Sequence, residues 1–154
     1  MRMLCVFVLT IAAAVAAVPA AQPAVIVNES VPFALIAFVP CANDGAGEAV
    51  LVEGTLHVLI TETVNDNHAS FKIHFQPQGA TGTGLTTGDT YHATGVTQES
   101  FTIGPNLTDT FINNFRIIGP GPDNNLLVHQ TIHVTINANG ELTSMVVNTS
   151  VECR

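Results

Sequence analysis

Apolar and polar residues alternate with a period of two along much of this chain. Between residues 50 and 64, apolar side chains fall mainly at even positions and polar side chains at odd positions. Residues 126–136 repeat the pattern, again with apolar residues at most even positions. Strict alternation is typical of a β-strand with one face buried. The pattern therefore predicts two long, half-buried strands.

Turn signals separate further short strands. Asn65-Asp66-Asn67 predicts a hairpin between residues 50–64 and 71–76, and a second short loop is predicted at 137–140. Pro77 is expected to end a strand, and the glycine- and threonine-rich residues 78–88 are expected to form a loop. The remaining strands are predicted at residues 91–97, 100–103, 110–118 and 142–151.

The order of these segments predicts an all-β fold of about seven to nine antiparallel strands. Two architectures fit, an up-and-down barrel and a β-sandwich, and the short turns favour the barrel. Residues 24–39 are apolar but interrupted by Pro32, which is typical of an edge strand or an extended arm.

The N-terminus has the pattern of a secretory signal peptide. Arg2 precedes an uncharged apolar stretch at residues 3–18, and small residues allow cleavage after Ala20 or Ala21. The stretch is shorter than the ~20 residues that span a bilayer. We therefore expect a signal peptide at 1–21, an N-terminal arm or edge strand at 22–40 and a single β-domain at 41–154. The mature protein is expected to be secreted or periplasmic, without a membrane span.

Removal of the signal peptide leaves two of the three cysteines, Cys41 and Cys153. In an exported protein such a pair predicts a disulfide, here one that ties the first and last strands. Free thiols and an intermolecular bridge are the alternatives.

Charge limits the classes of partner. The mature domain would keep three basic and twelve acidic residues, a formal charge of −9 with neutral histidines. Such a chain cannot neutralise a phosphate backbone, so nucleic-acid binding is excluded. Binding to anionic membrane surfaces is disfavoured for the same reason. Asn28, Asn106 and Asn148 lie in glycosylation sequons, which matter only in a host that glycosylates exported proteins.

The histidines are the main candidates for chemistry, because five of the six lie in predicted strands. His129 and His133 share one side of a strand but lie about 13 Å apart, too far to bind one metal together. The specific hypothesis is a polar pocket formed by residues of neighbouring strands: Glu53, His57, His74 and His133. The alternative is that these side chains lie on solvated strand faces. Neither a metal site nor a cofactor is predicted.

Two functions remain open. The first is a non-enzymatic domain that binds a small molecule or an extracellular partner, or has a structural role. The second is an enzyme with a histidine and carboxylate site in a barrel or cleft. The direction of the four candidate side chains distinguishes the two.

Five segments carry a resemblance to known proteins. They are Pro40-Cys41 with Gly47-Glu48, Gly54-Thr55-Leu56-His57, residues 86–91, residues 133–140 and the ending Glu152-Cys153-Arg154. In these segments the chain resembles a group of small exported bacterial proteins of unknown function. The resemblance implies export and an all-β domain, and it implies no activity.

Overall fold

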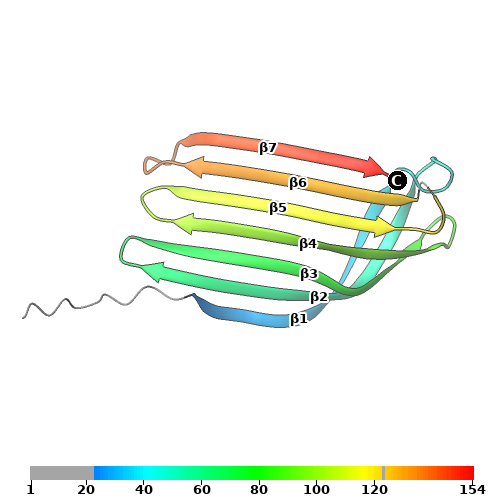
Figure 1. Ribbon diagram of the computed structural model, residues 1–154, viewed down its shortest axis with the longest axis horizontal. Helices are drawn as coiled ribbons and strands as arrows, with labels where there is room; N and C mark the ends of the chain where they lie inside the picture. The colour runs from blue at the N-terminus through cyan, green and yellow to red at the C-terminus, as the bar shows by residue number, and fades with distance from the viewer. Residues whose placement is uncertain (1–22, 123) are drawn as a thin grey trace, which may run out of the picture.

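The computed structural model describes residues 23–122 and 124–154, and it consists of one antiparallel sheet of seven strands. Each strand pairs with the next in the chain, in the order β1 to β7 (Figure 1). The strands are β1 (Ala24–Val39), β2 (Glu48–Asn65), β3 (His68–Gly84), β4 (Thr90–Ile103), β5 (Leu107–Ile118), β6 (Asn125–Ile136) and β7 (Leu142–Cys153).

The predicted all-β class, the number of strands and their sequential antiparallel order are confirmed. The sheet differs from the predicted barrel in that it is not closed, since β1 and β7 are its two edges. The described residues form no second sheet, so the molecule is not a sandwich either.

The sheet is open at one end and curled at the other. The β2–β3, β4–β5 and β6–β7 turns lie at the open end, where the strands form a broad, gently twisted layer (Figure 1). At the opposite end, β1 and β2 bend behind β4, β5 and β6. The core lies at this curled end and consists of Val39, Ala42, Val50, Val52, Ala80, Tyr91, Ala93, Ile117 and Leu126.

β3 is much longer than the sequence indicates. The prediction that Pro77 ends the strand and that residues 78–88 form a loop is wrong as far as Gly84. A register shift between Phe75 and Thr81 lets the strand continue past Pro77, with Gly79 at a positive φ of 60°. A bulge of this kind inserts residues into a strand without ending it.

The two segments predicted at 91–97 and 100–103 form one strand, β4. Residues 24–39 form an edge strand rather than a free arm, since β1 pairs with β2 along its whole length. Pro32 is tolerated there because an edge strand has one side without ladder hydrogen bonds.

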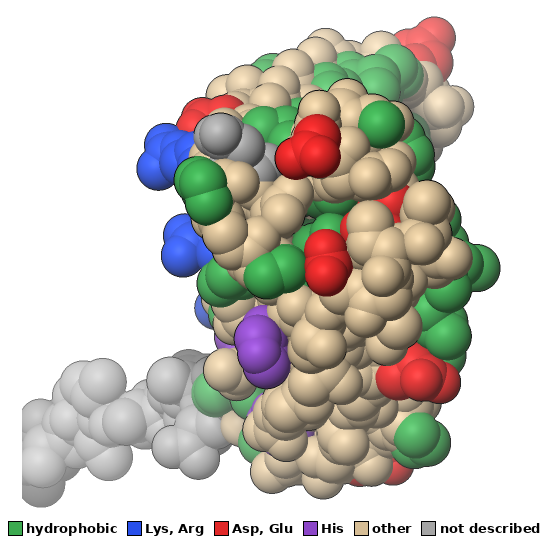
Figure 2. Space-filling view, turned by 90° about the vertical axis from the view of Figure 1, so that its right-hand side faces the viewer, with side chains coloured by type: hydrophobic (Ala, Val, Ile, Leu, Met, Phe, Trp, Pro, Cys, Tyr) green, Lys and Arg blue, Asp and Glu red, His purple; other side chains and the backbone are tan. Residues whose placement is uncertain are grey.

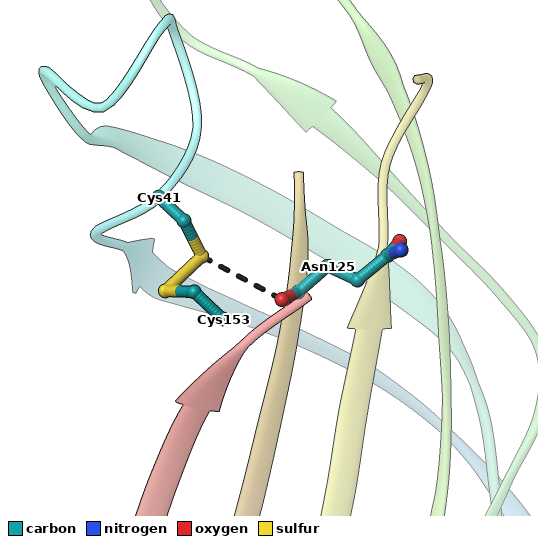
Figure 3. Close-up of a disulfide and its surroundings, with 3 residues drawn as sticks. All are labelled: Cys41, Asn125 and Cys153. Carbon is teal, nitrogen blue, oxygen red and sulfur yellow. Dashed lines mark hydrogen bonds between the residues drawn. A yellow bond between two sulfur atoms is a disulfide. The ribbon is translucent and has the colours of Figure 1, made fainter. Parts of the chain in front are cut away.

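The predicted disulfide between Cys41 and Cys153 is present (Figure 3), with a Cα–Cα distance of 5.8 Å. It joins the segment after β1 to the last residue of β7, across the curled end. Sγ of Cys41 also lies 3.5 Å from the carbonyl oxygen of Asn125. A disulfide sulfur has no hydrogen to donate, so this is a packing contact. The disulfide indicates an oxidising, extracellular type of environment.

The predicted signal peptide at residues 1–21 lies outside the described residues. Within the described part of the chain, no helix is long and apolar enough to cross a membrane.

Candidate functional site

The register of the strands divides the sheet into two faces. Residues that pair directly across an antiparallel ladder point to the same face. We call the face that contains the core the apolar face; it also carries Phe71, Phe75, Phe101, Phe111 and Phe115. The opposite side, the polar face, carries Thr61, Lys72, Ser100, Thr110 and His133 in one continuous row across β2 to β6.

Two grooves lie along the polar face. The first has a volume of about 540 Å³ and is lined by polar groups of His57, Thr61, Lys72, His74, Gln76, Gln98, Ser100 and Thr110, with Leu59, Ile73 and Ile112 among them. The second has about 550 Å³ and is lined by Asn114, Arg116, His129, Arg154 and further residues of β3 to β7. Gln76 lines both, so the grooves adjoin.

The first groove brings His57 and His74 together, as the predicted pocket requires. His133 lies in the neighbouring row and hydrogen-bonds through Nδ1 to Thr110 Oγ1, at 2.8 Å, at the edge of the groove. Glu53 lies apart from these three: it pairs with Ala34 and Thr81, and it does not line the groove. The structure therefore places three of the four predicted residues in or beside one groove and leaves the carboxylate outside it.

The histidines in or beside the two grooves have neutral hydrogen-bond partners. Nε2 of His57 donates to Oδ1 of Asn28 at 2.8 Å, and Gln98 hydrogen-bonds to His74 at 3.4 Å. His129 hydrogen-bonds to Asn114. The hydrogen bonds of the described residues include none between one of these rings and a carboxylate. The described residues also contain no group of three or more His, Cys, Asp or Glu side chains placed to hold a metal ion.

Charge is divided unevenly between the faces. Lys72, Arg116 and Arg154, the basic residues of the described chain, all line the two grooves. The register places the carboxylates of Glu29, Glu62, Glu99 and Asp109 on the apolar face, whereas Glu53 and Glu152 lie on the polar face. Glu99 contributes to the wall of the first groove, but its partners Ile73 and Phe111 place its side chain on the other side of the sheet.

In Figure 2 the basic side chains in view lie along one side of the molecule. Arg154 forms an ion pair with Glu152, with an N–O distance of 2.7 Å. That pair lowers the pKa of Glu152. For Lys72 and Arg116, no carboxylate of the described residues lies within ion-pair distance. The first groove therefore holds a cation for which the described residues provide no acidic partner.

A second polar cluster, which the sequence pattern did not predict, lies inside the curled end. Glu48 is 2% exposed and accepts a 2.6 Å hydrogen bond from the hydroxyl of Tyr91. Thr87 donates to the same carboxylate through both its hydroxyl and its backbone N–H, and the N–H of Thr86 also donates. Gly84 leaves the space that the carboxylate occupies. The sequence signal was the β-strand pattern itself, which places Glu48 on the same side as Val50 and Val52.

The cluster is enclosed, and its hydrogen-bonding groups are used within it. The carboxylate holds the connection between β3 and β4 against the start of β2. This arrangement explains how a charge is accommodated in the core. The open sites are the two grooves of the polar face, an apolar groove of about 410 Å³ beside Phe33 and Phe75, and a pocket of about 630 Å³ beside Cys41; of these, the first groove combines a cation with several neutral hydrogen-bonding side chains.

Comparisons of this chain with protein-family models, with curated proteins and with solved structures gave no match.

Proposed function

We propose that this protein is an exported, non-enzymatic binding domain that holds a small anionic molecule in the first groove of the polar face. The observation that carries the proposal is the position of Lys72, which lines this groove without a carboxylate partner among the described residues. An unpaired cation beside neutral hydrogen-bonding groups favours an anion, because charge-assisted hydrogen bonds are stronger than neutral ones.

The size and lining of the groove support a small ligand. Its volume of about 540 Å³ lies in the range of small-molecule sites. The amides of Gln76 and Gln98 and the hydroxyls of Ser100 and Thr110 offer donors and acceptors for a hydroxylated ligand. Leu59 and Ile112 provide apolar contact between these groups. A hydroxylated molecule with one carboxylate or phosphate group matches this lining.

Binding is favoured over catalysis by the surroundings of the histidines. General acid–base chemistry commonly uses a histidine oriented by a carboxylate, or a pair of carboxyl groups with different pKa values. Here His57 and His74 are oriented by Asn28 and Gln98, while Glu53 lies outside the groove. The groove therefore supports recognition of a ligand by hydrogen bonds and charge.

The proposal is tested by calorimetric titration of the purified protein with glucuronate, glucose 6-phosphate and neutral glucose. We expect at least one of the two anions to bind and glucose to bind far more weakly. Lys72→Gln should weaken binding of the anion about tenfold or more, since a hydrogen bond to a charged group contributes about 1.5–3 kcal/mol.

Arg154→Gln is the matched control, because it removes a cation that lies outside the first groove and is already paired with Glu152. It should leave binding of the anion within about twofold, since a partner already engaged in an exposed ion pair contributes little. The proposal is overturned if neither anion binds, if glucose binds equally well, or if Lys72→Gln binds like the unaltered protein.

A further inference from the structure

We propose that β7 is an interaction surface for a second copy of this chain. In the proposed dimer, the two β7 strands pair antiparallel about a two-fold axis and join the two sheets into one. The inference rests on the edge of the sheet, and it is independent of the ligand proposed for the polar face.

β7 exposes an unusual amount of apolar surface for an outer strand. Leu142, Met145, Val146, Val147 and Val151 are each more than half exposed. Met145 and Val147 lie on the apolar face, as partners of Val134 and Ile132, whereas Val146 lies on the polar face beside His133. A strand added alongside β7 would therefore cover apolar side chains on both faces at once.

β7 has few of the features that prevent edge strands from pairing, because its one register shift lies at its start, between Leu142 and Ser144, and its one charged residue, Glu152, lies at its end. Natural sheets protect their edges with charged side chains, proline or bulges, because unpaired N–H and C=O groups accept another strand. Residues 142–151 contain no charged residue and no proline. Figure 1 shows β7 as an extended strand along one side of the sheet. Its outer edge is thus a template for strand addition.

The other edge is protected. β1 contains Pro32, which lacks an N–H, together with Glu29 and a register shift between Val25 and Val27. Its second half bends toward the curled end (Figure 1), so it offers no long straight edge. The difference between the two edges favours β7 as the place of association.

A second copy fits this edge better than an unrelated strand does, because β7 is self-complementary. With Val146 on the two-fold axis, Val146 faces Val146 of the second copy and Met145 faces Val147 of the second copy. Glu141 and Glu152 flank the uncharged segment, so neither faces another carboxylate. The pairing thus avoids the like-charge contacts that two chains of this net charge would otherwise make. An isologous contact of this kind closes after two copies.

The test is the mass in solution of the full chain purified from an oxidising expression system, by sedimentation velocity over a range of concentrations. We expect a species of twice the chain mass. Val146→Lys should raise the dissociation constant of the dimer about tenfold or more, because two lysines would face each other across the axis. Val146 is 54% exposed, so the variant should keep its fold, which circular dichroism checks.

Ile36→Lys is the matched control, since Ile36 is 67% exposed and lies on the opposite edge strand. It should leave the dimer intact.

A second measurement uses Val146→Cys, which should give a covalent dimer whose linked peptide contains residue 146 of both copies. A monomer at every concentration overturns the proposal, as does a dimer that Ile36→Lys dissociates and Val146→Lys does not.

Discussion

Glu48 is a buried charge that the fold stabilises with hydrogen bonds. Burial of the carboxyl tends to raise its pKa, but the hydrogen bonds from Tyr91, Thr87 and Thr86 outweigh that effect and hold the pKa below its usual value. The pKa of Tyr91 changes in the opposite direction: burial and the adjacent carboxylate of Glu48 raise it. The folded protein therefore keeps Glu48 ionised and Tyr91 protonated.

Replacing this carboxylate is expected to destabilise the protein. Glu48→Gln removes the charge but keeps the shape, so about 1–3 kcal/mol of the free energy of unfolding should be lost. Glu53→Gln is the control, because Glu53 is an exposed glutamate of the same strand, and its effect should stay within about 0.5 kcal/mol. Equilibrium urea unfolding of both variants at neutral pH measures the difference.

The pH dependence of stability separates loss of charge from loss of packing. The pKa of Glu48 is lower in the folded protein than in the unfolded chain. The carboxylate therefore makes its full contribution to the free energy of unfolding above the usual pKa of about 4.3. As pH falls below that value, the unfolded chain takes up a proton first and the contribution declines. The unaltered protein should thus lose more stability on acidification than Glu48→Gln does. If the free energy of unfolding of the two proteins fell in parallel with pH, an ionised Glu48 in the folded state would be contradicted.

At the scale of the element, close packing explains why β3 has glycine at positions 82 and 84. A Cβ on Gly82 would lie 2.6 Å from Cγ1 of Val50 and 3.1 Å from Cβ of Tyr91. Gly82→Val should therefore destabilise the protein by about 1–3 kcal/mol, despite the higher β-propensity of valine. Thermal unfolding monitored by circular dichroism gives the size of the effect.

The neighbouring residue provides the control for that substitution. Thr83 is exposed on the opposite face of β3, so Thr83→Val should change the stability by less than about 0.5 kcal/mol. If Gly82→Val were tolerated as well as Thr83→Val, the close packing of β3 against Val50 and Tyr91 would be contradicted.

β3 also shows why part of the fold could not be predicted from the sequence. The alternation of apolar and polar residues in β2 and β6 depends only on which side of each strand is buried, and it predicts both strands correctly. Pro77 and the glycines after it resemble loop residues, because glycine and proline usually interrupt strands. The role of Gly82 depends on Val50 and Tyr91, and that of Gly84 depends on Glu48, and these residues come close to the glycines only in the folded sheet.

The candidate site, like the fold, could be predicted from the sequence only in part. Alternation places His57 and His74 on polar sides of their own strands, and the hairpin at residues 65–67 brings these strands together. The register shift between Glu53 and Thr55 is a tertiary feature without a signal in the alternation. The position of Glu53 relative to the histidines, and the grouping of Lys72 with them, therefore required the structure.

At the scale of the whole molecule, the sheet has a small core for its size. The nine buried apolar residues of the described chain all lie at the curled end, and the open end is a single layer. Isolated layers of this kind gain little from burial, so stability must depend strongly on what holds the curled end together. The disulfide lies there, between the segment after β1 and the end of β7.

Removing that bond should have a large effect on stability. Cys41 and Cys153 are 112 residues apart in the sequence, and closing a loop of that length stabilises a protein by about 4–5 kcal/mol in the chain-entropy model. The double variant Cys41→Ala/Cys153→Ala should therefore lose several kcal/mol of its free energy of unfolding. Urea unfolding under non-reducing conditions, with the unaltered protein in the absence and presence of a reductant, provides the comparison.

Reduction and double substitution should shift the urea midpoint by similar amounts, because both remove the same constraint from the unfolded chain. The double variant should also lose order first at the curled end, since no ladder hydrogen bonds join β1 to β7 among the described residues. Hydrogen exchange should thus accelerate most in residues 40–47 and at the ends of β6 and β7. Uniform acceleration over all seven strands would instead mean that the bond acts on the unfolded chain alone and does not hold the two edges of the sheet together.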